Sequence, residues 1–138
     1  MHRRWRLSGR LDELAGMAAQ VEAFAAAARL SSELTGILNL VLEEWFVNLI
    51  HHGLGGQKAP WIEVRLALER DRVVCWLRDN GIPFDPGDHR FPDLDAPLQE
   101  RRAGSLGIYL IRSLVDSWDY RREGGCNLNR IEKRIVPS

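Results

Sequence analysis

The spacing of apolar and polar positions divides the chain into helices and strands. Apolar residues recur at three- and four-residue steps over 31–52, which predicts an amphipathic helix packed on a core. Ser31 suits the cap at its start and Gly53 the cap at its end. The apolar stripe of this helix comprises Leu34, Ile37, Leu38, Val41, Leu42, Trp45, Phe46 and Leu49.

An alanine-rich stretch over 12–30 has the same helical spacing and predicts an earlier helix, with Asp12 or Ser8 as its cap. Before it, residues 2–8 alternate loosely and predict a first strand. The arginines of that strand suit an exposed sheet edge, so we expect an edge strand there.

Alternation with a period of two predicts hairpins in the second half of the chain. Residues 61–69 and 73–78 predict the first hairpin, and 118–122 with 127–136 predict the last. Between them, a polar segment with several prolines is followed by glycines that open a helix over 103–116.

Length and composition limit the classes of protein that fit. A chain of 138 residues with 45% hydrophobic content predicts one domain, 1–138, with a single core. The formal net charge of +0 gives no electrostatic argument for binding nucleic acid or an anionic membrane. No long uncharged apolar run predicts a membrane span. Cys75 and Cys126 fall in predicted strands without metal-ligand spacing, so we expect a reduced, cytoplasmic protein.

Three polar residues, Glu44, Asn48 and His52, follow one another at four-residue steps on the longer helix. Four residues make about one turn, so their side chains lie along one face. A carboxylate can take a proton or orient water, and an amide oxygen is a hard ligand suited to Mg²⁺. The same positions also fit a solvated helix edge that ends at Gly53.

Two glycine-containing segments add to this set. Asp79 ends a predicted strand, where its carboxylate can accept a hydrogen bond from the exocyclic amine of adenine; Gly81 lets the backbone approach a flat ring. Residues 104–107 precede a helix and offer free backbone N–H groups to phosphates. Each segment alone also fits an ordinary turn, whereas the ordered set is more specific.

In this order the segments resemble the GHKL ATPase superfamily, which includes gyrase, the Hsp90 chaperones, histidine kinases and MutL. They are most similar to the small anti-sigma-factor serine kinases. Glu44-x-x-x-Asn48 with His52-Gly53 matches the N box of the family. Asp79-x-Gly81, followed by Phe84-Asp85-Pro86, matches the first glycine box, and Gly104-x-x-Gly107-Ile108 matches the second. The likeness covers nearly the whole chain.

The resemblance implies a role for each matching residue. Glu44 is expected to be the general base and Asn48 the Mg²⁺ ligand. The adenine-binding box contributes Asp79, Gly81 and Phe84. The phosphate-binding segment comprises Gly104, Ser105, Leu106 and Gly107.

The chain departs from the family pattern at two of these positions. Ser105 stands where the second of two adjacent glycines is usual, which reduces backbone freedom there. His51 stands where histidine kinases often carry a lysine, and its charge near neutral pH is conditional. Arg101 and Arg102, at the end of the short lid, fit either a phosphate contact or a solvated loop end.

The implied fold is an α/β two-layer sandwich of the Bergerat type, a mixed, mainly antiparallel sheet with helices on one face. The predicted order of elements agrees with it. The implied function is an ATP- and Mg²⁺-dependent serine/threonine protein kinase that binds a sigma factor and phosphorylates a small antagonist protein. Homodimers are common among family members of this size.

Two other functions stay open. A nucleotide-binding interaction module with little phosphotransfer is favoured by Ser105 and the short lid. A detached histidine-kinase catalytic domain is disfavoured, because no phosphoacceptor helix precedes the domain in this sequence.

Overall fold

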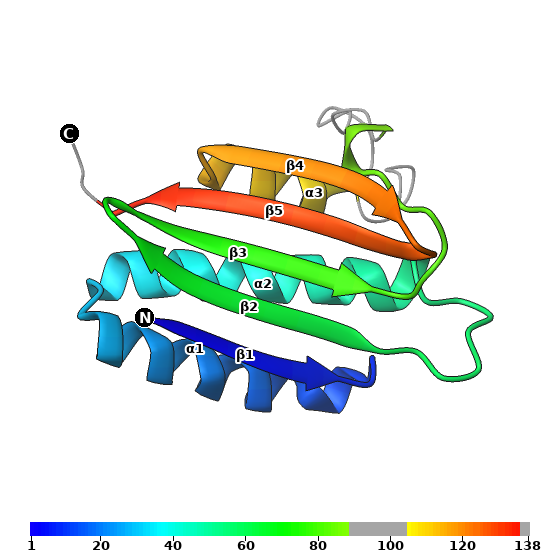
Figure 1. Ribbon diagram of the computed structural model, residues 1–138, viewed down its shortest axis with the longest axis horizontal. Coiled ribbons are helices and arrows are strands. Elements are labelled where there is room, and N and C mark those ends of the chain that lie inside the picture. Colours follow the sequence, from blue (N-terminus) through cyan, green and yellow to red (C-terminus); the bar gives the residue numbers. More distant parts are fainter. Residues whose placement is uncertain (89–104, 136–138) are drawn as a thin grey trace.

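Three helices cover one face of a five-stranded sheet in the computed structural model, which describes residues 1–88 and 105–135 (Figure 1). Among the described residues, no helix lies on the other face of the sheet, onto which Figure 1 looks. The expected two-layer α/β sandwich is confirmed. The elements are β1 (His2–Leu7), a 3-10 turn (Leu11–Glu13), α1 (Leu14–Ala28), α2 (Ser32–His52), β2 (Ile62–Glu69), β3 (Arg72–Asp79), a second 3-10 turn (Pro86–Asp88), α3 (Ser105–Leu114), β4 (Ser117–Glu123) and β5 (Cys126–Arg134).

The strands lie in the order β1-β2-β3-β5-β4. All four neighbouring pairs are antiparallel, so the parallel pair of a mixed sheet is absent among the described strands. β1 is an edge strand, as its arginines predict. β5 lies between β3 and β4, and its register places Asn127 opposite Asp79.

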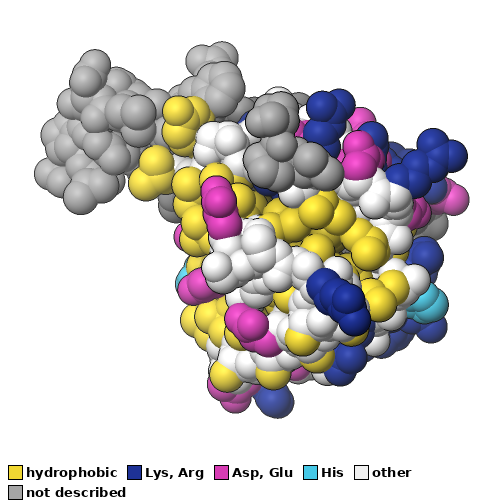
Figure 2. Space-filling view, turned by 90° about the vertical axis from the view of Figure 1, so that its left-hand side faces the viewer, with side chains coloured by type: hydrophobic (Ala, Val, Ile, Leu, Met, Phe, Trp, Pro, Cys, Tyr) yellow, Lys and Arg dark blue, Asp and Glu magenta, His cyan; other side chains and the backbone are white. Residues whose placement is uncertain are grey.

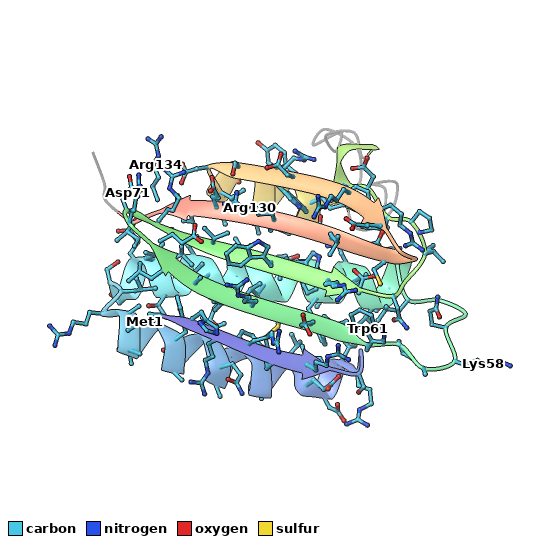
Figure 3. The ribbon with its side chains drawn as sticks, in the orientation of Figure 1. Met1, Lys58, Trp61, Asp71, Arg130 and Arg134 are labelled. Carbon is cyan, nitrogen blue, oxygen red and sulfur yellow. The ribbon has the colours of Figure 1, made fainter. Side chains whose placement is uncertain are left out.

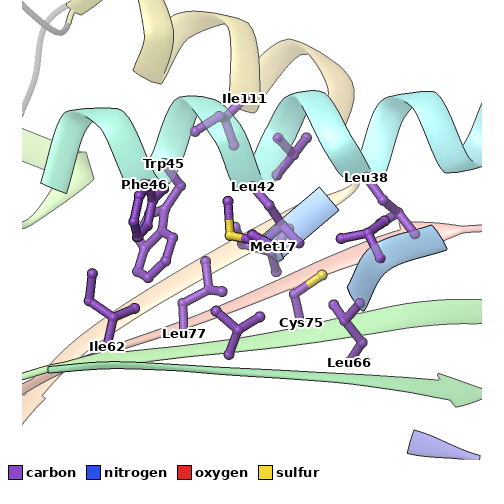
Figure 4. Close-up of a cluster of buried hydrophobic side chains, with 14 of the residues drawn as sticks. Met17, Leu38, Leu42, Trp45, Phe46, Ile62, Leu66, Cys75, Leu77 and Ile111 are labelled. Carbon is purple, nitrogen blue, oxygen red and sulfur yellow. The ribbon is translucent and has the colours of Figure 1, made fainter. Parts of the chain in front are cut away.

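The core lies between α2 and the inner face of the sheet (Figure 4). Leu42 and Phe46 of α2 are fully buried, and Leu66 and Leu77 face them from β2 and β3. α1 adds Met17 to the same cluster. The helical stripe predicted from the sequence is therefore the face that packs on the sheet, and it positions the polar residues beside it.

The cap of α2 is as predicted, but that of the preceding helix is not. Ser31 Oγ accepts a 3.1 Å hydrogen bond from the backbone N–H of Leu34. At the earlier helix, the Glu13 carboxylate accepts hydrogen bonds from the backbone N–H groups of residues 8–10. The predicted caps Asp12 and Ser8 are wrong, because the carboxylate of Glu13 reaches back to satisfy the preceding turn.

The two cysteines lie in β3 and β5, as expected, and both are buried free thiols. Burial raises the pKa of the Cys75 thiol to about 12. Among the helices of the described residues, none has the length and apolarity needed to cross a membrane.

Candidate functional site

Asn48 lies on the face of α2 that is turned toward α3, and it is buried. Its Nδ2 donates a 2.9 Å hydrogen bond to the backbone oxygen of Glu44, one turn earlier. Its Oδ1 is buried and has no hydrogen-bond partner among the described residues. An unpaired buried acceptor costs about 1–3 kcal/mol, so it marks a position that a ligand would satisfy.

The first turn of α3 passes directly over Glu44 and Asn48. A Cβ atom on Gly107 would lie 2.6 Å from Asn48 Nδ2 and 2.7 Å from Glu44 Oε2. A side chain does not fit at this position without a shift of its neighbours, because Cβ atoms in proteins essentially never lie within 3.0 Å of such atoms. Because Gly107 has no side chain, the glycine-rich segment at the start of α3 can pack directly against the Glu44–Asn48 motif of α2. Burial raises the pKa of Glu44, and the negative charge of Glu43 adds to the effect.

Asp79 ends β3 on the inner face of the sheet and is buried. Its Oδ1 accepts hydrogen bonds of 2.8 Å from Gly81 N and 2.9 Å from Asn127 Nδ2, whereas its Oδ2 is buried without a described partner. Burial raises the pKa of Asp79, although the hydrogen bonds from Asn127 and Gly81 oppose the shift. Gly81 also has no room for a Cβ, because the carbonyl of Gly53 lies against it.

Asn127 is the main residue that the sequence analysis did not single out. Its Nδ2 also donates a 2.8 Å hydrogen bond to the oxygen of Ile82, and its Oδ1 accepts from the backbone N–H of Phe84. Arg122 Nη1 donates to the oxygen of Gly81 over 2.7 Å. Asn127 thus ties β5 to the turn after Asp79. The available signal was the inward-facing alternation of Asn127 and Asn129 in a predicted strand.

Asn48 and Asp79 line one small cavity between α2, α3 and the sheet. Its volume is about 10 Å³, room for about one water molecule. A ring as large as adenine enters only if part of the wall moves. The cavity is lined by Trp45, Asn48, Leu49, Asp79, Phe84, Pro86, Ile108, Ile111, Trp118 and Asn129.

The other predicted site residues lie farther from Asn48 and Asp79 in the fold or fall outside the described residues. His51 is exposed on the last turn of α2, and no hydrogen bond or ion pair joins it to the described part of the site. Ser105 begins α3 and Leu106 is exposed. Gly104 and the lid arginines lie outside the described residues.

The donors at the site suit a hard metal ion with few protein ligands. Within 1–88 and 105–135, no group of three His, Cys, Asp or Glu side chains could hold a metal. The orphaned amide oxygen of Asn48, beside the Glu44 carboxylate, still fits Mg²⁺, which keeps several waters and binds substrate phosphates.

Comparison with known families agrees with this arrangement. The model of the histidine kinase-like ATPase domain matches residues 7–133. The chain belongs to this family. The resemblance drawn from the three motifs is therefore confirmed.

Relatives of known name are protein kinases. The chain is 28% identical over 109 residues to the serine/threonine-protein kinase BtrW of Bordetella bronchiseptica, covering 79% of this chain and 77% of BtrW. It is 25% identical over 92 residues to the serine-protein kinase RsbW of Bacillus cereus, covering 64% of this chain and 57% of RsbW. The match thus spans little more than half the length of RsbW.

Solved structures show the same fold at low identity. The RsbU and RsbW domains of Rv1364c from Mycobacterium tuberculosis superpose with a TM-score of 0.66 at 13% identity, covering 99% of this chain and 34% of that one. A histidine kinase domain from Erythrobacter litoralis superposes with a TM-score of 0.57 at 16% identity, covering 90% of this chain and 60% of that one.

Proposed function

We propose that this protein is an ATP-dependent serine/threonine protein kinase. The observation that carries the proposal is the unpartnered Asn48 amide oxygen, buried one helical turn from the Glu44 carboxylate and directly beneath the start of α3. The names of the relatives, which are serine/threonine and serine-protein kinases, support it.

Asp79 is suited to hold the adenine base. Its Oδ1 is already occupied by Gly81 and Asn127, which fix the carboxylate and leave Oδ2 as the acceptor for an exocyclic amine. Gly81 keeps the backbone beside it free of a side chain. Because the cavity is small, binding of the base requires the wall near Phe84 and Ile108 to open.

Asn48 and the backbone at the start of α3 are suited to the other end of the nucleotide. Asn48 Oδ1 would serve as the protein ligand to Mg²⁺, and Gly107 keeps that position accessible. The first turn of α3, which begins at Ser105, would offer its free N–H groups to phosphate oxygens. When bound, Mg²⁺ neutralises phosphate charge.

Glu44 would accept the proton of the attacking hydroxyl. Its raised pKa makes the carboxylate a stronger base than an exposed glutamate, and its position one turn before Asn48 holds it near the phosphates. The hydroxyl belongs to a serine or threonine of a small antagonist protein, in keeping with the anti-sigma-factor kinases that the motifs resemble. A sigma factor is the proposed second partner.

The test is transfer of labelled phosphate from ATP to the antagonist protein encoded nearest to this chain. Acid-stable label on a serine or threonine of the partner is the expected result. Acid-labile label on a histidine would instead indicate a histidine kinase. Binding of ATP with no label on any partner would favour a nucleotide-binding interaction module. Asp79→Asn serves as the control, because it should weaken binding of the adenine base and therefore lower the transfer of label.

A further inference from the structure

The outer face of the sheet, opposite the helices and turned toward the viewer in Figure 3, carries two rows of side chains that are rich in arginine. Strand register places the members of each row side by side across all five strands. The first row comprises Arg4, Arg65, Trp76, Arg130 and Asp119, and the second comprises Arg6, Glu63, Arg78, Leu128 and Arg121. All of these side chains except Arg6 line a groove of about 450 Å³.

Four of these arginines stack on the rings of two tryptophans. The Arg65 guanidinium lies 4.3 Å from the centre of the Trp76 ring, and that of Arg130 lies 5.8 Å from it. Arg6 and Arg78 stack in the same way on Trp61, at 4.9 and 5.4 Å. A stacked guanidinium keeps its N–H edges free for a planar anion and loses little side-chain entropy on binding it.

Positive charge on this face exceeds negative charge, although the whole chain has a net charge of +0. The two rows hold six arginines but only two carboxylates, Glu63 and Asp119. Arg4, Arg65 and Arg78 make no ion pair with any described carboxylate, whereas Arg6, Arg121 and Arg130 pair with Glu63, Glu123 and Glu132. In Figure 2, dark blue side chains gather along the right-hand edge, where the outer face lies.

We propose that this groove binds an acidic segment of a partner protein, with carboxylates placed on Arg65 and Arg130. These arginines lie on strands on either side of β3, so the two carboxylates would be roughly 10 Å apart. The Arg65 guanidinium can take a carboxylate through two parallel hydrogen bonds. Arg130 Nη2 already lies 2.9 Å from Glu132 Oε1, so Arg130 would add its remaining N–H groups to the second carboxylate. The half-buried Trp76 and Leu128 offer apolar contact between them.

The charges of the groove favour an acidic peptide segment over a nucleic acid and over a second copy of this chain. Glu63 and Asp119 lie within the rows and would repel the continuous phosphates of a nucleic acid. A second copy of this chain, docked through the same face, would bring two surfaces with an excess of positive charge together. A peptide with separated carboxylates meets neither penalty. The proposal does not depend on the nucleotide site, which lies on the inner face.

The test measures fluorescence anisotropy of a short labelled peptide of repeating Glu-Leu-Glu units, without nucleotide. The wild-type chain is expected to bind it, and added salt is expected to weaken binding. Arg65→Glu combined with Arg130→Glu should lower the affinity by at least about tenfold, whereas Arg65→Lys, which keeps the charge and loses the planar fork, should lower it a few-fold. Lys58→Glu, in the exposed loop labelled in Figure 3, makes the same charge change away from the groove and should leave binding intact.

Circular dichroism shows whether each variant keeps its fold. No binding by the wild type, or equal binding by the arginine variants, would overturn the proposal. Tighter binding of a single-stranded thymidine oligonucleotide through the same arginines would assign the groove to nucleic acid instead. A change in molecular mass of the arginine variants by light scattering would assign it to self-association.

Discussion

Asn127 and Asp79 face each other across β5 and β3, and Asn127 Nδ2 donates a 2.9 Å hydrogen bond to Asp79 Oδ1. Both side chains are almost fully buried. The pair determines which oxygen of Asp79 remains available for a ligand. Several predictions about the proposed ATP site depend on it or on its neighbours.

Replacement of Asn127 by alanine should both destabilise the fold and weaken ATP binding. The change leaves Asp79 Oδ1 and the oxygen of Ile82 without the amide donor, at a cost of about 1–3 kcal/mol in the free energy of unfolding. Urea denaturation measures the first effect and calorimetry with ATP the second. Unchanged ATP affinity in the folded variant would make Asn127 a structural residue only.

Replacement of Asp79 by asparagine should raise the melting temperature near neutral pH while weakening ATP binding. Burial raises the pKa of Asp79. Above that pKa the ionised carboxylate is less favourable in the folded chain than in the unfolded chain, where water solvates it, so its charge lowers the free energy of unfolding. The gain should shrink as pH falls through the aspartate range, because the wild-type carboxyl is then protonated in both states. Scanning calorimetry at about pH 7 and about pH 4 checks the sign. A lower melting temperature at about pH 7 would mean that Gly81 and Asn127 offset the burial cost.

Replacement of Gly107 by alanine should weaken ATP binding by about tenfold or more. The new Cβ would push against Asn48 Nδ2 and Glu44 Oε2 and displace α3 from the phosphates. Gly36→Ala in α2 is the matched control, because nothing lies within 4 Å of its added Cβ. That control should keep its ATP affinity and gain about 0.5–1 kcal/mol of stability.

Replacement of Glu44 by glutamine should separate chemistry from binding. The amide keeps the size of the side chain and removes the base, so phosphotransfer should fall by about 10²–10⁴-fold. ATP affinity should change little, and calorimetry must be run beside the kinase assay because Mg²⁺ lies nearby in the proposed complex. Unchanged transfer would remove Glu44 from the mechanism.

Binding of ATP should change the tryptophan fluorescence of the protein. Trp45 and Trp118 line the small cavity at Asp79, whose wall must move to admit a base. Trp118→Phe should therefore reduce the change, whereas Trp76→Phe, on the outer face, should not. An equal signal from all three proteins would place the binding site elsewhere.

Local pattern predicted the helices and strands well, because each depends on neighbours in sequence, whereas the roles of the candidate site residues stay predictions. The period of α2 and its cap at Ser31 needed no tertiary information. The cap by Glu13 was missed, because it depends on how the chain turns back from β1. Asn127 was missed as a partner of Asp79 for a related reason. Its role arises only from the register of two strands 48 positions apart in sequence.

The place of β5 has a consequence for how the protein is made. β5 leaves the ribosome after the other described strands, yet it lies between β3 and β4. Until it is synthesised, β3 has an open edge and Asp79 lacks the donor that orients it. Nascent chains that end before residue 126 cannot form the Asp79–Asn127 pair, so the ATP site we propose would assemble only after synthesis has passed β5.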